Sequence, residues 1–261
     1  MAAVARPVLG LDRGGDGPPL VLLHPLGADR HVWAPVWDRV AAHREVVSVD
    51  LPGFGGSPPL PDAVVPTPAA LARAVAAGLA AHGLDRFHVA GNSLGGWVAL
   101  ELALAGRAES VTAIAPAGLW PEPLMPRRGA ARRLARAALP AVALLARSER
   151  GRRLALLGTV AHPERIPPAD AAHLVRAYAT APGFEAVDGA MRAGRFLGLA
   201  GIRVALTLAW PEHDRLVARP GRLPERARSV VLDGCGHLPM WDDPAQVAAV
   251  LLEGSAVAAA P

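Results

Sequence analysis

A serine between two glycines is the residue of this chain with the clearest chemical potential. Ser93 lies in a Gly-x-Ser-x-Gly pattern that follows the apolar run 87–90 and precedes a helix-like run. At the apex of such a strand–turn–helix, flanking residues need to lack side chains so that strand and helix can pass closely. Gly91 and Gly95 meet that need. The pattern predicts a nucleophilic serine; the alternative is a serine that only caps the helix.

An acid and a histidine follow the serine, each after an apolar run. Asp214 follows the run 204–209, and His237 follows the run 230–232. A serine hydroxyl needs a base in hydrogen-bond reach and a third group that orients the base. The order Ser, Asp, His, each at the carboxyl end of a predicted strand, places all three at one edge of a parallel sheet. We predict acyl transfer, with Ser93 as nucleophile, His237 as base and Asp214 as its partner.

Four other acids lie near this pair in the sequence. Three flank the histidine too closely to reach its far ring nitrogen, and two of these read as the start of a helix. The fourth precedes Asp214 on the same loop. The acids set aside are Glu212, Asp233, Asp242 and Asp243.

A sheet with helices on both faces is needed to position these residues. Short apolar runs alternate with helix-length segments, which is typical of an α/β fold with a mostly parallel sheet. Strands are expected at 7–11, 20–24, 45–49, 87–90, 110–115, 203–209 and 229–232. Helices are expected at 32–41, 68–82, 94–104 and 244–252.

One stretch is far longer than a βα connection requires. Between the strands ending at 115 and starting at 203, the composition predicts two or three helices with kinked joints over 130–153 and an amphipathic helix over 167–181. We expect a core formed by residues 1–118 and 199–261, with a helical insertion at 119–198.

Charge is concentrated in this insertion. The chain carries a net charge of +4, and all its basic residues are arginine. Residues 119–198 hold 13 arginines and 6 acids, a net of +7, which leaves −3 elsewhere. Three interpretations stay open: solvated arginines on helix faces, attraction of an anionic substrate, or contact with an anionic membrane surface. No nucleic-acid, dinucleotide, Walker or metal-ligand signature accompanies the charge, so we expect no nucleic-acid partner, cofactor or metal.

Size and apolar patterning suit one soluble enzyme domain. The 261 residues, 52% of them hydrophobic, suffice for one core and a small insertion. The start of the chain has no secretory pattern, and the run 134–146 is shorter than the ~20 residues of a membrane span. Cys235, the single cysteine, is read as a small buried turn residue, with a redox or nucleophilic role as the alternative. We expect a cytoplasmic protein, and the oligomeric state stays open.

The motifs together resemble the α/β-hydrolase superfamily, in particular its small lidded esterases, lactonases and C–C hydrolases. The resemblance covers nearly the whole chain apart from 119–198, where that family inserts its lid. It implies the α/β-hydrolase fold and a Ser-His-Asp triad. The motifs that carry it, besides the serine turn and the Asp214 loop, are Leu20-Val21-Leu22-Leu23-His24, Asp50-Leu51-Pro52-Gly53-Phe54-Gly55-Gly56-Ser57 and Gly236-His237-Leu238-Pro239.

The oxyanion loop departs from the family pattern. The family has His-Gly-x-Gly where this chain has His24-Pro25-Leu26-Gly27. Proline has no N–H, so the resemblance implies that the backbone amides of Leu26 and Leu94 stabilise the oxyanion. His24 would brace the loop or be a simple core histidine.

These residues favour a serine hydrolase that cleaves a small carboxylic ester or lactone through an acyl-enzyme. Serine at the elbow, where the dehalogenase and epoxide hydrolase branches have aspartate, argues against those branches. C–C bond or thioester hydrolysis, a cofactor-free lyase or perhydrolase reaction, and a non-catalytic ligand receptor stay open. An anionic or aryl substrate would suit the basic insertion and Trp97. Trp120 and Leu238 are candidate pocket walls.

Overall fold

A twisted seven-stranded sheet organises the residues that the computed structural model describes, 9–125 and 129–256. The strand order is β1-β3-β2-β4-β5-β6-β7; β1 pairs antiparallel with β3, and the other neighbours are parallel. The strands are β1 Leu11–Gly14, β2 Pro19–Leu23, β3 Glu45–Val49, β4 Phe87–Asn92, β5 Ala108–Ile114, β6 Ala205–Pro211 and β7 Arg228–Leu232.

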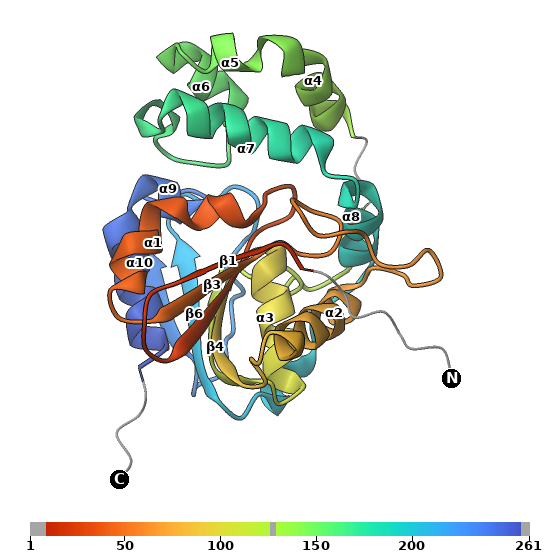
Figure 1. Ribbon diagram of the computed structural model, residues 1–261, viewed down its shortest axis with the longest axis vertical. Helices are drawn as coiled ribbons and strands as arrows, with labels where there is room; N and C mark the ends of the chain where they lie inside the picture. The colour runs from red at the N-terminus through yellow and green to blue at the C-terminus, as the bar shows by residue number, and fades with distance from the viewer. Residues whose placement is uncertain (1–8, 126–128, 257–261) are drawn as a thin grey trace.

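Helices cover both faces of the sheet, and a further group of helices lies across one end of it (Figure 1). The α-helices are α1 Trp37–Ala41, α2 Pro68–Ala81, α3 Leu94–Leu104, α4 Ala130–Ala138, α5 Val142–Leu145, α6 Glu149–Ala155, α7 Pro168–Thr180, α8 Phe184–Ala193, α9 Pro239–Asp242 and α10 Pro244–Gly254. The 3₁₀ helices are η1 Arg30–Val36, η2 Leu139–Ala141, η3 Pro163–Arg165 and η4 Gly198–Gly201.

Side-chain alternation along the strands divides the core into two layers. In β2, Val21 and Leu23 join the cluster that contains the buried residues of α2 and α3, whereas Leu20 and Leu22 join the cluster that contains those of α1 and α10. Successive side chains of a strand point to opposite faces, so a strand covered on both sides is apolar throughout. The predicted fold class, an α/β-hydrolase-type sheet with helices on both faces, is confirmed.

Two predicted elements differ from the structure. The first strand is Leu11–Gly14 and not 7–11, of which residues 7 and 8 lie outside the described residues. Both backbone groups of Gly10 bond to the segment after β3: its carbonyl accepts from the Asp50 amide, and its amide donates to Ser57 Oγ. The segment that pairs with β3 is the more polar Leu11–Gly14. Polar side chains are tolerated there because β1 is the edge strand of the sheet and is exposed to solvent.

The predicted helix 32–41 is also divided. It consists of η1, in 3₁₀ geometry, followed by α1. Pro35 lies inside η1, and its missing N–H and ring are incompatible with a continuous α-helix. The other predicted elements begin and end within a few residues of the observed ones.

The stretch between β5 and β6 folds into the helices α4 to α8. In Figure 1, α4, α5 and α6 lie outermost, α7 lies beneath them, and α8 lies beside the core. The joint at η2 contains Pro140, in agreement with the expected kinked helices. Val142 of α5 and Ala146, which follows that helix, share one apolar cluster with Leu174 and Val175 of α7 and with the core helices. We call residues 119–198 the insert.

Within the described part of the chain, no helix combines the length and the apolar character that crossing a membrane would require.

Candidate active site

Ser93 forms the sharp turn between β4 and α3. Its backbone has φ 56° and ψ −114°, a region that is strained for a residue with a side chain. Its amide donates to the Ile114 carbonyl (2.9 Å), and its carbonyl accepts from the amides of Trp97 (3.1 Å) and Ala117 (3.0 Å). The Ser93 side chain makes no capping hydrogen bond to α3. The helix-cap alternative therefore lacks its defining contact.

Two glycines allow the turn to be this tight. A Cβ atom on Gly91 would lie 2.2 Å from the Gly95 carbonyl oxygen, and one on Gly95 would lie 2.1 Å from the Leu23 carbonyl oxygen and 2.7 Å from that of His24. The elbow therefore lies directly against the end of β2, where the oxyanion loop begins.

Asp214 and His237 are brought together from two separate loops. Asp214 Oδ2 lies 2.7 Å from His237 Nδ1, and Asp214 Oδ1 accepts from the amides of Leu216 (2.7 Å) and Val217 (3.1 Å). Burial opposes ionisation of the carboxyl, but the hydrogen bond from His237 and the two amides outweigh it, so the pKa of Asp214 is lowered. An ionised carboxylate only accepts hydrogen bonds. His237 therefore carries its proton on Nδ1, which leaves Nε2 free to accept one.

The rival acids take part in other contacts. Glu212 accepts from the Gly234 amide (2.9 Å), and Asp243 caps α10 by accepting from the Gln246 amide (2.9 Å). Asp233 exchanges backbone hydrogen bonds with the Gln246 side chain.

Asp242 has a role that local sequence did not reveal. Its carboxylate accepts from the amides of Gly236 (2.8 Å), Ala161 (3.0 Å) and His162 (2.8 Å). The first belongs to the turn before His237 and the other two to the insert. One side chain thus joins the insert to the histidine loop, and only the long-range fold reveals the contact.

His24 holds the backbone of the loop that is predicted to donate to the oxyanion. Its Nε2 accepts from the Leu51 amide (2.9 Å), so its Nδ1 carries the proton and donates to the Pro25 carbonyl (2.8 Å). Burial, which outweighs the hydrogen bond to Pro25 and nearby carboxylates, lowers the pKa of His24. The Pro25–Leu26 peptide is trans, so its carbonyl and the Leu26 amide point in opposite directions. Because the Pro25 carbonyl points toward His24, the Leu26 N–H of the same peptide points away from His24.

The two backbone amides predicted to bind the oxyanion make no hydrogen bond to the described residues. Neither Leu26 nor Leu94 donates its backbone N–H to another described residue. Leu94 is the first residue of α3, where a helix leaves amides unpaired and the dipole favours negative charge.

The insert contacts both of these loops. The Leu238 amide donates to the Thr159 carbonyl (2.8 Å). On the other side, a Cβ on Gly27 would lie 2.7 Å from the Tyr178 ring and 3.0 Å from the Phe184 ring. Tyr178 and Phe184 are thus neighbours of the oxyanion loop that sequence reasoning missed, because nothing in their local sequence indicates which core loop they contact.

The two candidate wall residues have different surroundings. Leu238 is buried beneath the insert. Trp120 packs edge-on against Trp97, with ring centroids 5.8 Å apart, and its indole N–H donates to the Gly194 carbonyl (2.9 Å). Their role as pocket walls stays a prediction.

Cys235 is buried, and burial together with the neighbouring aspartates raises the pKa of its thiol to about 12. A thiol of this kind is protonated at neutral pH and is a poor nucleophile.

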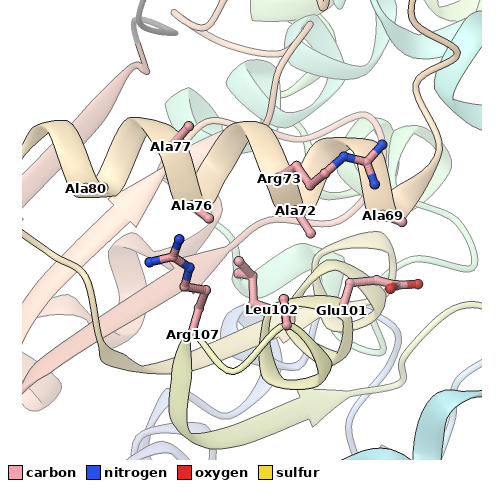
Figure 2. Close-up of a pocket in the computed structure, with 10 residues that line it drawn as sticks. Ala69, Ala72, Arg73, Ala76, Ala77, Ala80, Glu101, Leu102 and Arg107 are labelled. Carbon is pink, nitrogen blue, oxygen red and sulfur yellow. The ribbon is translucent and has the colours of Figure 1, made fainter.

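Two surface cavities flank the core. A groove of about 440 Å³ runs between α2 and α3, and Figure 2 shows the alanines and Arg73 of α2 along one side, facing Glu101, Leu102 and Arg107 on the other. A cavity of about 240 Å³ lies beside Asp214 and includes Trp210. Ser93 lines neither of these two cavities and is buried, with 7% of its surface exposed. Across the described residues, no cluster of three or more His, Cys, Asp or Glu side chains is placed to hold a metal ion.

The sheet order, the serine turn and the paired histidine and aspartate are those of one large class of enzymes. A sequence model described as "Alpha/beta hydrolase family" matches residues 20–250, and the chain belongs to that family. The family model and the relatives described next, which are named as hydrolases, show that the chain is an enzyme of the hydrolase class.

Among curated relatives, the chain is similar to epoxide hydrolase EphH of Mycobacterium tuberculosis, with 34% identity over 63% of this chain and 84% of that protein. It is also similar to the pimeloyl-[acyl-carrier protein] methyl ester esterase of Aeromonas salmonicida, with 42% identity over 37% of this chain but only 36% of that protein. Among solved structures, a bacterial membrane phospholipase A has a TM-score of 0.72 and 27% identity over 95% of this chain and 83% of its own. The enol-lactonase of Burkholderia xenovorans LB400 has a TM-score of 0.73 and 24% identity, with 94% and 95% covered, and shows the fold alone.

Proposed function

We propose that the protein is a serine hydrolase that cleaves a small carboxylic ester or lactone through an acyl-enzyme. The observation that carries this proposal is the 2.7 Å contact between His237 Nδ1 and Asp214 Oδ2, which leaves Nε2 as a base in a chain with a strained, uncapped serine elbow. The family membership and the esterase relative support the same reaction class.

In the proposed reaction, Ser93 Oγ attacks the substrate carbonyl carbon while His237 Nε2 takes the hydroxyl proton. Collapse of the tetrahedral intermediate expels the alcohol, which receives that proton from His237. Water then attacks the acyl-serine with His237 again as base, which releases the acid and restores the serine. Asp214 stabilises the imidazolium in both halves.

The negative charge on the carbonyl oxygen requires donors that are already in place. The amides of Leu26 and Leu94 serve in this role, the first held through His24 and the second at the start of α3. Each such donor contributes roughly 10²–10³-fold to the rate.

The chemistry of serine separates this proposal from epoxide opening, the activity named for one relative. Attack of a serine oxygen on an epoxide carbon would give an alkyl ether, which water does not cleave under these conditions. Attack on a carbonyl gives an ester, which the same base can hydrolyse. With Ser93 at the elbow, the site is suited to turnover of acyl compounds.

The insert acts as a lid in this proposal. Ser93 is buried, and the insert contacts the loops that carry Gly27 and Leu238, so in this proposal a substrate enters when the helices of the insert move away from those loops. Tyr178 and Phe184, which lie against Gly27, would form part of the acyl pocket, with Trp120 and Leu238 as further walls.

The test is covalent labelling by a fluorophosphonate, combined with turnover of p-nitrophenyl esters of increasing acyl length. Wild type should be labelled at Ser93 and hydrolyse short esters, and Ser93→Ala should lose both, with kcat at least about 10⁴-fold lower. Ser148→Ala, a change of a serine in the insert, should behave as wild type. A folded wild-type protein that is neither labelled nor active, but binds a ligand tightly, would replace this proposal by the receptor alternative.

A further inference from the structure

Four titratable side chains outside the proposed triad join the insert to the core. Asp29 Oδ2 lies 2.7 Å from His173 Nε2, and His31 Nε2 lies 2.9 Å from Asp170 Oδ1. Asp29 and His31 belong to the segment that enters η1, whereas Asp170 and His173 belong to α7. Each ion pair therefore crosses the interface, with the acid on opposite sides in the two pairs.

The pairs form one cluster. The imidazole rings of His31 and His173 lie 4.5 Å apart, centroid to centroid, and His31 also packs against Trp241 at 6.2 Å. Two imidazolium ions at that distance would repel each other without neighbouring anions. Asp29 and Asp170 supply one negative charge for each ring.

The cluster is continuous with the oxyanion loop. Asp29 lies three residues after Leu26, and the intervening turn is closed by the Ala28 amide, which donates to the Pro25 carbonyl (3.2 Å). Asp29 Oδ1 accepts from the His31 amide (3.1 Å). The Asp29 carboxylate thus caps η1, which follows the loop, with one oxygen and contacts α7 with the other.

We propose that the Asp29–His173 pair, which lies beside the His31–Asp170 contact, is a proton-dependent latch that holds α7 against the oxyanion loop, and that Asp29 and His173 act as positioning residues for the Leu26 amide. The attachment of α7 to the core is argued from the contacts described above. Its consequence for catalysis rests on the proposed function.

Protonation determines the direction of the effect. The hydrogen bond to Asp29 raises the pKa of His173 above its ordinary value of 6.5, against burial and the nearby Arg176. Burial opposes the ionisation of Asp29, but His173, His24 and the His31 amide lower its pKa below 3.8. Asp170 adds a second negative charge beside His173. The stabilisation by His173 is complete below pH 6.5 and is lost as the pH rises through its raised pKa; that by Asp29 is lost as the pH falls through its lowered pKa. The latch is therefore closed at mildly acidic pH and loosens on the alkaline side.

Hydrogen–deuterium exchange of the full-length protein at pH 6 and pH 9, corrected for intrinsic exchange rates, tests the latch without reference to activity. Protection of α7 and of the segment entering η1 should fall at least about threefold in wild type, because loss of the His173 proton removes a charge-assisted hydrogen bond across the interface. Asp29→Asn keeps an oxygen for the His31 amide, and His173→Gln keeps a donor. Both should be low in protection at pH 6 and lose the pH dependence.

His162→Gln is the matched control, because His162 pairs with Glu164 inside the insert itself (3.6 Å). It should keep the wild-type pH response. Equal protection of α7 at both pH values in wild type, or a wild-type response in Asp29→Asn and His173→Gln, would overturn the latch.

A kinetic measurement then tests the positioning role. If Ser93 is labelled and esters turn over, Asp29→Asn should lower kcat more than it changes KM, and the alkaline fall of wild-type kcat should lose the component due to His173. Unchanged kcat in that variant would contradict positioning. Absence of labelling would contradict the proposed hydrolase function and leave the exchange result valid.

Discussion

Single side chains hold the candidate site through hydrogen bonds to backbone groups. His24 fixes the Pro25 carbonyl, and Asp50 accepts from the amides of Arg30 (2.7 Å) and Gly56 (2.7 Å). Asp50 therefore stabilises its own turn. Backbone amides and carbonyls of loops have no ladder partners, so a buried loop needs such side chains.

We predict that His24→Leu lowers both stability and kcat. It leaves the buried Leu51 N–H unpaired, which should cost about 1–3 kcal/mol of unfolding free energy at pH 7, and it frees the Leu26 amide, which should lower kcat by up to about 10²–10³-fold. Urea unfolding and ester turnover measure the two effects.

The pH dependence of this effect has a defined sign. Because burial lowers the pKa of His24, its contribution to stability is present above the ordinary value of 6.5 and is lost as the pH falls below it. The destabilisation by leucine should therefore be smaller at pH 5 than at pH 7. His43→Leu, at an exposed position, is the control; an equal loss of kcat there would contradict the bracing role.

At the scale of elements, the site depends on how closely α3 approaches the end of β2. Gly95 makes this approach possible, since a side chain there would overlap the Leu23 and His24 carbonyl groups. By contrast, Gly189 of α8 has no heavy atom within 4 Å of a built Cβ. The same residue type is thus required at one helix and dispensable at another.

Gly95→Ala should separate α3 from the oxyanion loop. We expect destabilisation of about 1–3 kcal/mol, typical of overpacking a close contact, with near-complete loss of ester turnover. Gly189→Ala should be neutral or stabilise by about 0.5–1 kcal/mol, because alanine favours helices. Thermal unfolding of both variants checks the contrast, and a stable, active Gly95→Ala would show that the approach is looser than described.

At the scale of the whole molecule, some of the insert's positive charge is structural. Arg132 is buried; it donates to the carbonyls of Tyr178 (2.9 Å) and Ala181 and pairs with Glu185. Its guanidinium also lies 4.7 Å from the centroid of the Phe184 ring. Arg152 likewise donates to backbone carbonyls, including that of Glu164 (2.8 Å). These arginines connect the helices of the insert. The excess of positive charge in the sequence did not indicate this structural role.

Arg132→Lys should destabilise the insert although the charge is kept. A lysine cannot reproduce the planar, multiply bonded geometry of arginine, and two carbonyls would lose donors, which should cost about 1–3 kcal/mol. Arg150→Lys, at an exposed position, should stay within about 0.5 kcal/mol of wild type. Exchange protection of α4 and α7 measures the difference. A shift in preference between anionic and neutral esters, with no change in protection, would instead assign Arg132 to substrate attraction.

The sequence by itself determined the features that depend on neighbours along the chain. The glycines around Ser93, the order of the three candidate residues, the apolar strands and the Asp243 cap of α10 all follow from local sterics and from the periodicity of burial. These interactions join residues that are close in the sequence, so the local sequence pattern predicts them.

Only the tertiary structure decided which distant groups meet. The contact between Asp214 and His237, the bridge from Asp242 to the insert, and the two His–Asp pairs on α7 join loops far apart in sequence. The first strand is Leu11–Gly14 and not the more apolar range 7–11, because an edge strand of the sheet can be polar. Charges and hydrogen bonds act through space, and their partners are fixed by the packing of the insert on the sheet, which periodicity along the chain does not specify.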